Sequence, residues 1–174
     1  MPGSPLKKQP AFGYHQAMYR AVLTLLVGLM LSLSGQVSGS NVLPNASPEE
    51  QYVFALGRVM ANDLEIAEAA FAEFPILNPG HPRVADSLFW LGRVQFLQEK
   101  YEAAAITFSS FNKDHPNDAR LPDTTEWLAE AVSRYAPDKQ ACEIYGELSN
   151  ILQRPSDEFN RRLVALRRAK NCGR

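Results

Sequence analysis

The sequence predicts an all-α protein, a helical-repeat solenoid with three helix pairs and a C-terminal capping helix. The first observation is self-similarity, because residues of matching size and hydrophobicity return every 37 positions, as in stacked helical repeats. The second observation is the helical spacing of apolar residues within each period. The recurring sets are Phe54, Leu91 and Leu128; Ala55, Gly92 and Ala129; Ala67, Ala104 and Ala141; Phe71, Phe108 and Tyr145; and Phe74, Phe111 and Leu148. Stacked repeats form extended binding surfaces, so we expect a function in holding another macromolecule.

Residues 1–40 are predicted to be a secretory signal peptide that is removed from the mature protein. An apolar run from Ala21 to Leu33 follows Arg20 and precedes a stretch of small residues. This run is shorter than the about 20 residues that a membrane span requires, and a single membrane anchor is the alternative interpretation. We therefore expect no stable membrane insertion after cleavage. Residues 41–46 are then a short linker.

Met18 is an alternative start, because a signal that begins there has a more usual length. Cleavage is expected after Gly39 or Ser40. The chain has two cysteines, Cys142 and Cys172, and neither is close enough to the cleavage site for lipid attachment to a mature N-terminal cysteine. In an exported protein they are expected to form one disulfide that pins the terminal helix to the last repeat. The alternative is a reactive thiol pair, for which the C-x-x-C spacing is missing.

Residues 47–155 are predicted to form the three repeats. The first helix has a clear start, with Ser47 as the cap, Pro48 at the first helical position and Glu50 completing a capping box. The expected helix pairs run from Pro48 to about Phe74, from Pro82 to Asp114 and from Arg120 to about Ile151, with turns at Asn62-Asp63, Glu99-Lys100 and Ala136-Pro137-Asp138.

Residues 156–174 are predicted to form a C-terminal capping helix and tail. Ser156 is the expected cap, and Phe159, Leu163 and Leu166 form the apolar stripe. Arginines occupy the other faces of this helix. A solvated outer face is the favoured interpretation of these charges, and binding to anionic lipid or peptidoglycan is the alternative.

The first helix of each pair is expected to line the inner wall of the stack, where a partner would bind. Its exposed positions follow from the helical wheel. The candidate residues are Tyr52, Leu56, Phe89, Arg93, Phe96, Glu126 and Glu130. The apolar members would bury side chains of a peptide or helix, and Arg93 would pair with a carboxylate. The alternative for Leu56 and Phe96 is packing between repeats.

Motifs for catalysis are not found in the sequence. His81 and His115 each precede a proline in the turns between repeats, and we expect them to shape these turns. The sequence contains no zinc-protease, phosphate-loop or nucleophile-elbow pattern. We therefore expect a protein that is not an enzyme and that holds no cofactor or metal. The formal net charge of −1 gives no indication of a nucleic-acid partner.

Part of the sequence resembles the tetratricopeptide repeat, a helix-turn-helix unit of about 34 residues. The matching residues are Leu91-Gly92, Tyr101, Ala104, Phe108, Phe111 and Pro116. Residues 47–152 are more specifically similar to the C-terminal domain of the Tol-Pal system protein YbgF family, also called the cell division coordinator CpoB family. This similarity lies in Tyr52 to Leu56 with Asn62-Asp63-Leu64, in Phe89 to Gly92 with Lys100 to Ala104, and in the late cysteines Cys142 and Cys172.

The resemblance implies a periplasmic protein of a Gram-negative bacterium. Members of that family bind TolA-like envelope proteins of the Tol-Pal system and help to coordinate envelope constriction with cell division. Many members also carry an N-terminal coiled coil that forms a trimer. Residues 41–47 show no heptad pattern, so we expect a monomer. The alternatives are another exported repeat scaffold, serving outer-membrane protein assembly or secretion, and a subunit associated with a peptidoglycan enzyme.

Overall fold

The structure is a computed structural model that describes residue 43 and residues 45–173. The predicted signal peptide, the alternative start at Met18 and half of the predicted linker (residues 41, 42 and 44) lie outside the described residues. Among the helices that are described, none has the length and apolar character needed to cross a membrane.

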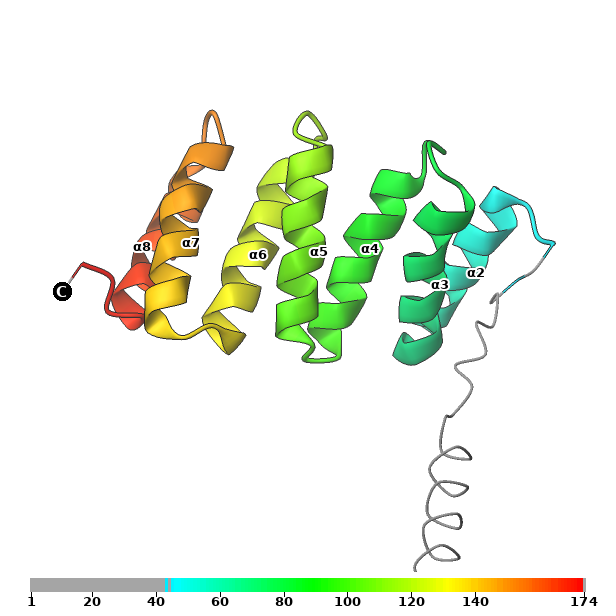
Figure 1. Cartoon of the computed structure of the whole chain (residues 1–174), viewed down its shortest axis with the longest axis horizontal. Coiled ribbons are helices and arrows are strands. Elements are labelled where there is room, and N and C mark those ends of the chain that lie inside the picture. The colour runs from blue at the N-terminus through cyan, green and yellow to red at the C-terminus, as the bar shows by residue number, and fades with distance from the viewer. Residues whose placement is uncertain (1–42, 44, 174) are drawn as a thin grey trace, which may run out of the picture. The chain divides into compact units, whose positions relative to one another are not determined.

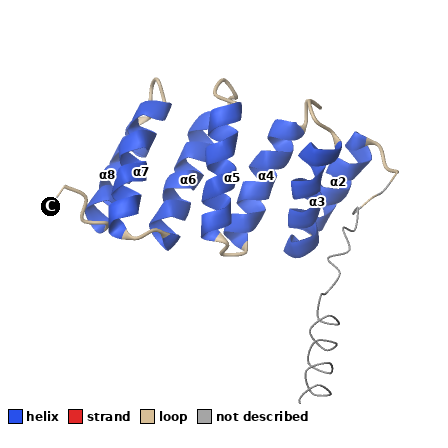
Figure 2. Cartoon of the chain, in the orientation of Figure 1, coloured by secondary structure: helices blue, strands red, loops and turns tan. Residues whose placement is uncertain are grey.

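The described residues form seven α-helices and no strand (Figures 1 and 2). The helices are α2 (Pro48–Met60), α3 (Leu64–Leu77), α4 (Val84–Leu97), α5 (Tyr101–Asp114), α6 (Leu121–Tyr135), α7 (Asp138–Ile151) and α8 (Asp157–Ala169). Each helix packs against the next one in the chain. This arrangement of three sequential pairs and a final helix confirms the predicted all-α class, and it is consistent with a tetratricopeptide-like solenoid.

The helices form two layers. The first helices of the repeats lie in one layer, in which α4 contacts α6 and α6 contacts α8. The second helices, α3, α5 and α7, form the other layer and lie in front of α2, α6 and α8 in Figure 1. The final helix α8 thus occupies the place that the first helix of a fourth repeat would take.

Both predicted serine caps are confirmed. The backbone N–H of Ser47 donates to the Glu50 carboxylate over 2.8 Å, and the N–H of Glu50 donates to the Ser47 hydroxyl over 3.4 Å, which is the reciprocal capping box. At the start of α8, the N–H of Phe159 donates to the Ser156 hydroxyl over 3.0 Å. These side chains satisfy backbone donors that have no partner within the helix.

Helix α3 extends beyond its predicted end. It was expected to stop at about Phe74, but it continues through Pro75 to Leu77. A proline inside a helix has no N–H for the carbonyl four residues before it, which is that of Phe71. The hydroxyl of Ser87, at the start of the next repeat, donates to this carbonyl over 2.8 Å. A neighbouring helix therefore provides the missing hydrogen bond, and α3 tolerates its proline.

Aromatic rings connect successive repeats. Phe71 of α3 stacks on Trp90 of α4, with ring centroids 6.5 Å apart, and Phe108 of α5 stacks on Trp127 of α6 at the same distance. The ring of Phe108 is fully buried and also lies against Gly92 of α4, where an added Cβ would be only 2.6 Å from it. The absence of a side chain at Gly92 therefore makes room for the Phe108 ring.

The predicted disulfide between Cys142 and Cys172 is present and joins α7 to the residues after α8. The Nζ of Lys170 adds a second tie, because it donates to the carbonyl of Ala136 over 2.7 Å. Phe159 and Leu163 of α8 are buried in the same core cluster as the third repeat. The terminal helix is thus attached both covalently and by packing, as the sequence predicted.

We predict that Gly92→Ala lowers the free energy of unfolding by about 2 kcal/mol, because the new methyl group meets the immobile Phe108 ring and overpacks the core. Urea unfolding followed by circular dichroism measures this change. Gly57→Ala in α2 is the matched control, since a Cβ there meets no atom within 4 Å. The control should be neutral or slightly stabilising because alanine favours the helix; equal losses for both variants would contradict the packing argument.

We also predict that replacing Cys142 and Cys172 by serine lowers the free energy of unfolding by about 3 kcal/mol, because the crosslink restricts a loop of 30 residues in the unfolded chain. Guanidinium unfolding of the oxidised protein and the variant measures the difference. A reductant should bring the wild type to the level of the variant and leave the variant unchanged. If the reductant lowered the free energy of unfolding of both the wild type and the serine variant, its effect would not come from the disulfide.

Candidate protein-binding surface

The structure buries one of the predicted surface residues. Tyr52 was expected to be exposed, but it is only 6% exposed, and that expectation is wrong. Its ring packs edge-on against Phe71 and Phe74 at 6.0 and 6.1 Å, and the Arg83 guanidinium covers its face at 4.6 Å. The helical wheel places Tyr52 correctly on α2, but it does not show the arginine of the next repeat that covers the ring.

Two further candidates, Leu56 and Phe96, are half-buried and pack between helices. Leu56 lies against the N-terminal core cluster. Phe96 packs edge-on against Tyr101 at 5.2 Å and against Trp127 at 4.9 Å. Their positions agree with the alternative of packing between repeats, and Phe96 connects α4 to α6.

Arg93 lies at the centre of an aromatic cluster. Its guanidinium carbon is 5.7 Å from the ring centroid of Phe89, 5.5 Å from that of Trp90 and 4.9 Å from that of Trp127. These distances are within the range of cation–π attraction. Arg93 is half-buried, and the described residues give it no salt bridge. The Arg93 guanidinium can therefore still donate hydrogen bonds to a carboxylate of a partner.

The remaining two candidates line a groove between α6 and α8, which we call the α6–α8 groove. It has a volume of about 260 Å³ and is lined by Glu126, Trp127, Ala129, Glu130, Glu158, Phe159, Arg162, Leu163 and Leu166. Trp127 therefore faces both the groove and the cluster around Arg93. Trp127 is not among the residues predicted for the binding surface, because the groove exists only when α8 lies beside α6.

Carboxylates dominate the charge of the α6–α8 groove. Glu130 forms a salt bridge with Arg162 across it. Glu126 is exposed, and partial burial is the largest cause that raises its pKa, followed by the nearby charges of Glu158 and Asp123, with Arg162 acting in the opposite direction. The raised pKa of Glu126 thus reflects burial first, and the neighbouring carboxylates of Glu158 and Asp123 add to it.

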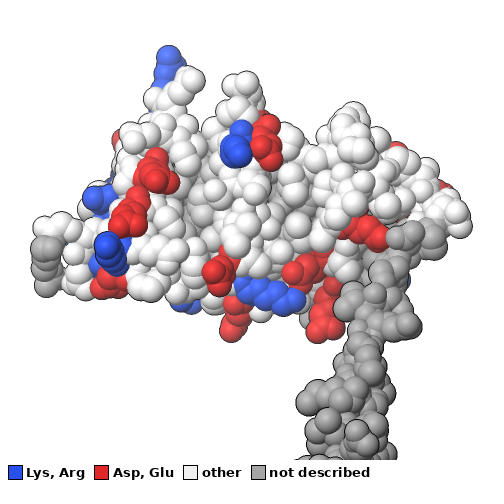
Figure 3. Space-filling model, in the orientation of Figure 1, with Lys and Arg blue, Asp and Glu red and all other residues white. Residues whose placement is uncertain are grey.

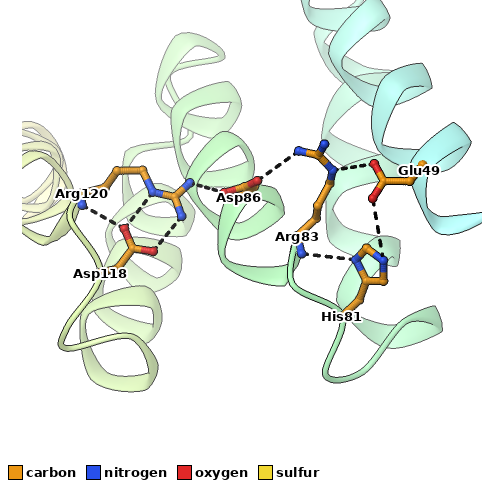
Figure 4. A network of polar contacts seen from close by, with 6 residues as sticks. All are labelled: Glu49, His81, Arg83, Asp86, Asp118 and Arg120. Carbon is orange, nitrogen blue, oxygen red and sulfur yellow. Dashed lines mark hydrogen bonds and ion pairs between the residues drawn. The ribbon is translucent and has the colours of Figure 1, made fainter.

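The edge of the first-helix layer carries a chain of ion pairs (Figure 4). Arg83 donates to Glu49 over 2.6 Å and to Asp86 over 3.3 Å. Arg120 donates to Asp86 over 2.7 Å and to Asp118 over 2.8 and 2.9 Å. We call this chain the arginine ladder. It links the starts of successive repeats through carboxylates and guanidinium groups in turn.

The arginine ladder follows the 37-residue period and then stops. Arg83 covers Tyr52, and Arg120 approaches Phe89 in the same way, with its guanidinium carbon 5.4 Å from the ring. The position one period after Arg120 is Asp157. Asp123 stands one period after Asp86, but within the described part of the chain no arginine pairs with it.

The second-helix layer has a different character. Figure 3 shows this face, with a broad uncharged area at its centre. A second groove of about 300 Å³ lies between α5 and α7, and apart from Glu147 it has no charged lining residue. It contains none of the predicted candidates.

Of the seven predicted residues, the structure places Phe89, Arg93 and Phe96 in one cluster with Trp127. Glu126 and Glu130 lie beside this cluster, in the α6–α8 groove that Trp127 also lines.

The fold and this surface define the chain as an all-α helical-repeat protein. A scan against protein-family models finds no match for the sequence, and a search of curated proteins finds none either. The tetratricopeptide-like arrangement therefore stands on the helices themselves, on their pairing and on their 37-residue period.

We predict a pH-dependent contribution from the arginine ladder. Hydrogen bonds from Arg120 lower the pKa of Asp118 from 3.8 to about 2. A carboxylate with a lowered pKa stabilises the fold above its unfolded-state pKa and loses this effect as the pH falls toward 2. Asp118→Asn should therefore lower the free energy of unfolding by about 1 kcal/mol at neutral pH, allowing for solvent screening.

Urea unfolding of wild type and Asp118→Asn at several pH values measures this contribution. The difference between them should shrink as the pH falls through the range from 3.8 to about 2. Asp114→Asn is the control, because Asp114 is exposed at the end of α5; it should change the stability by less than about 0.5 kcal/mol. A difference for Asp118→Asn that is independent of pH would contradict this account.

Proposed function

We propose that the mature chain is an exported adaptor that binds another protein through its first-helix layer. The observation that carries this proposal is the continuous surface from Phe89 and Arg93 through Trp127 to the α6–α8 groove. Aromatic rings and arginine are the residue types that contribute most to protein interfaces. The surface combines an apolar area with charges of both signs, which suits a peptide or helix laid across the repeats.

The disulfide supports the proposed compartment. Disulfides persist in oxidising compartments such as the bacterial periplasm and are rare in the cytosol. The link between Cys142 and Cys172 therefore agrees with the signal peptide predicted in residues 1–40. Together they favour a periplasmic protein.

We further propose that the partner is a TolA-like envelope protein and that the adaptor serves the coordination of envelope constriction with cell division. The support for this finer proposal is the resemblance of residues 47–152 to the YbgF/CpoB family. The Arg93 cluster and the α6–α8 groove are built from described residues of α4, α6 and α8 within one chain. A monomeric adaptor is sufficient for this mode of binding.

Titration calorimetry of the mature chain with the soluble domain of the TolA-like protein from the same genome tests this proposal. Phe89→Ala removes the ring beneath Arg93, and Arg93→Glu reverses the charge. We expect each substitution to weaken binding about tenfold or more, which corresponds to about 1.4 kcal/mol. Circular dichroism confirms that the variants are folded.

Lys113→Glu is the matched control for the charge reversal. Lys113 is exposed on α5, which belongs to the second-helix layer, so this variant should bind like the wild type. Unchanged affinity for both Phe89→Ala and Arg93→Glu would exclude the proposed surface. A wild-type chain that does not bind the TolA-like domain would exclude that partner.

A further inference from the structure

We infer that the α6–α8 groove binds a cationic amphipathic segment of the partner protein, in which lysine or arginine side chains flank apolar ones. This inference rests on the proposed function, because it assigns the chemistry of the segment that an adaptor would hold. It goes beyond the proposed function by locating the site at the last repeat and by stating the charge of its ligand.

The floor of the groove is apolar. Phe159 and Leu163 of α8 are buried beneath it, and Trp127 of α6 and Leu166 of α8 are half-buried. Trp127 is held in place from behind, since it stacks on the buried Phe108 and packs edge-on against Phe96. A rigid aromatic and aliphatic floor favours burial of a partner's apolar side chains.

The rim of the groove is acidic. Among the described residues, three carboxylates line it, those of Glu126, Glu130 and Glu158, and Arg162 is the one cation. Arg162 is already engaged, because it forms a salt bridge with Glu130. Within the described residues, Glu126 and Glu158 make no salt bridge. A cationic side chain of a partner would lie between two carboxylates that repel each other and would relieve this repulsion.

The end of the arginine ladder adds to the acidic charge near the groove. In the earlier repeats, Arg83 and Arg120 neutralise Glu49 and Asp86. One period later the arginine is replaced by Asp157. Among the described residues, Asp123 at the start of α6 therefore has no salt bridge with a guanidinium. The charge of Asp123 reaches Glu126, where it raises the pKa together with that of Glu158. Asp123 does not itself line the groove, but its charge adds to the attraction that a cation beside Glu126 would experience.

The state of Glu126 gives the site a pH dependence. Its pKa is raised first by burial and then by the charges of Glu158 and Asp123; Arg162 lowers it and Glu130 raises it slightly. A bound cation favours the ionised carboxylate. The affinity for a cationic segment should therefore fall as the pH is lowered through the pKa of Glu126, because the protonated group no longer attracts the cation.

Two synthetic peptides test the inference. Both are short amphipathic helices with the same leucine and alanine positions, and the polar positions are lysine in one and glutamate in the other. We expect the mature chain to bind the lysine peptide more tightly than the glutamate peptide. Binding should shift the indole N–H resonance of Trp127 and leave that of Trp90, the other tryptophan of the chain, largely unchanged.

The paired substitutions Glu126→Gln and Glu158→Gln remove the charge while keeping similar size. They should weaken binding of the lysine peptide about tenfold and abolish its dependence on pH. Glu143→Gln with Glu147→Gln is the matched control, because both residues are exposed on α7 in the opposite layer. The control should retain the wild-type affinity.

Equal affinity for the two peptides, no binding of the lysine peptide, or an unchanged affinity in the Glu126→Gln, Glu158→Gln variant would overturn the inference. Binding of the TolA-like domain tests the proposed function separately. If the TolA-like domain binds and Phe89→Ala weakens it while the lysine peptide does not bind, the adaptor remains and the groove assignment fails. If the lysine peptide binds as expected but the TolA-like domain does not, the groove assignment remains and the proposed partner fails.

Discussion

An aromatic ring that crosses from one repeat to the next sets the spacing of this stack. Phe108 is the clearest case, because its buried ring lies against Gly92 of its own repeat and stacks on Trp127 of the following one. The same contact joins Phe71 to Trp90 one period earlier. Each ring thus connects three helices, and the position of Trp127 in the candidate binding surface follows from the packing of the core behind it. The candidate binding surface and the core therefore share Trp127, which packs against the core cluster and lines the groove.

Helix α8 has two roles that are physically linked. Its inner stripe closes the core of the last repeat, as expected for a terminal helix that must shield apolar surface from water. The same helix supplies one wall of the α6–α8 groove, with Glu158 and Arg162 at the rim. The groove therefore lies where the periodic pattern ends. In the described part of the chain, the arginine ladder also has no further member after Arg120, which leaves the charge of Asp123 near the groove.

The sequence was sufficient to predict the all-α class, the helix pairs, both serine caps and the pairing of the cysteines, because period, capping and cysteine number are local or one-dimensional signals. It was not sufficient where a distant residue decides the outcome. The end of α3 depends on Ser87, and the burial of Tyr52 depends on Arg83, each from the following repeat. The role of Trp127 in the groove depends on the position of α8. A helical wheel contains none of these tertiary contacts.

The hydrogen bond from Ser87 to the Phe71 carbonyl has a consequence for how the repeats fold. Pro75 leaves that acceptor without a backbone donor from its own helix, so within the first helix pair alone this carbonyl depends on water for a donor. Repeat proteins are often treated as units with separate intrinsic stabilities coupled only at their boundaries. In this chain the boundary contact completes a helix, and the first unit is therefore not energetically autonomous. Loss of the second repeat would fray the first from its C-terminal end inward.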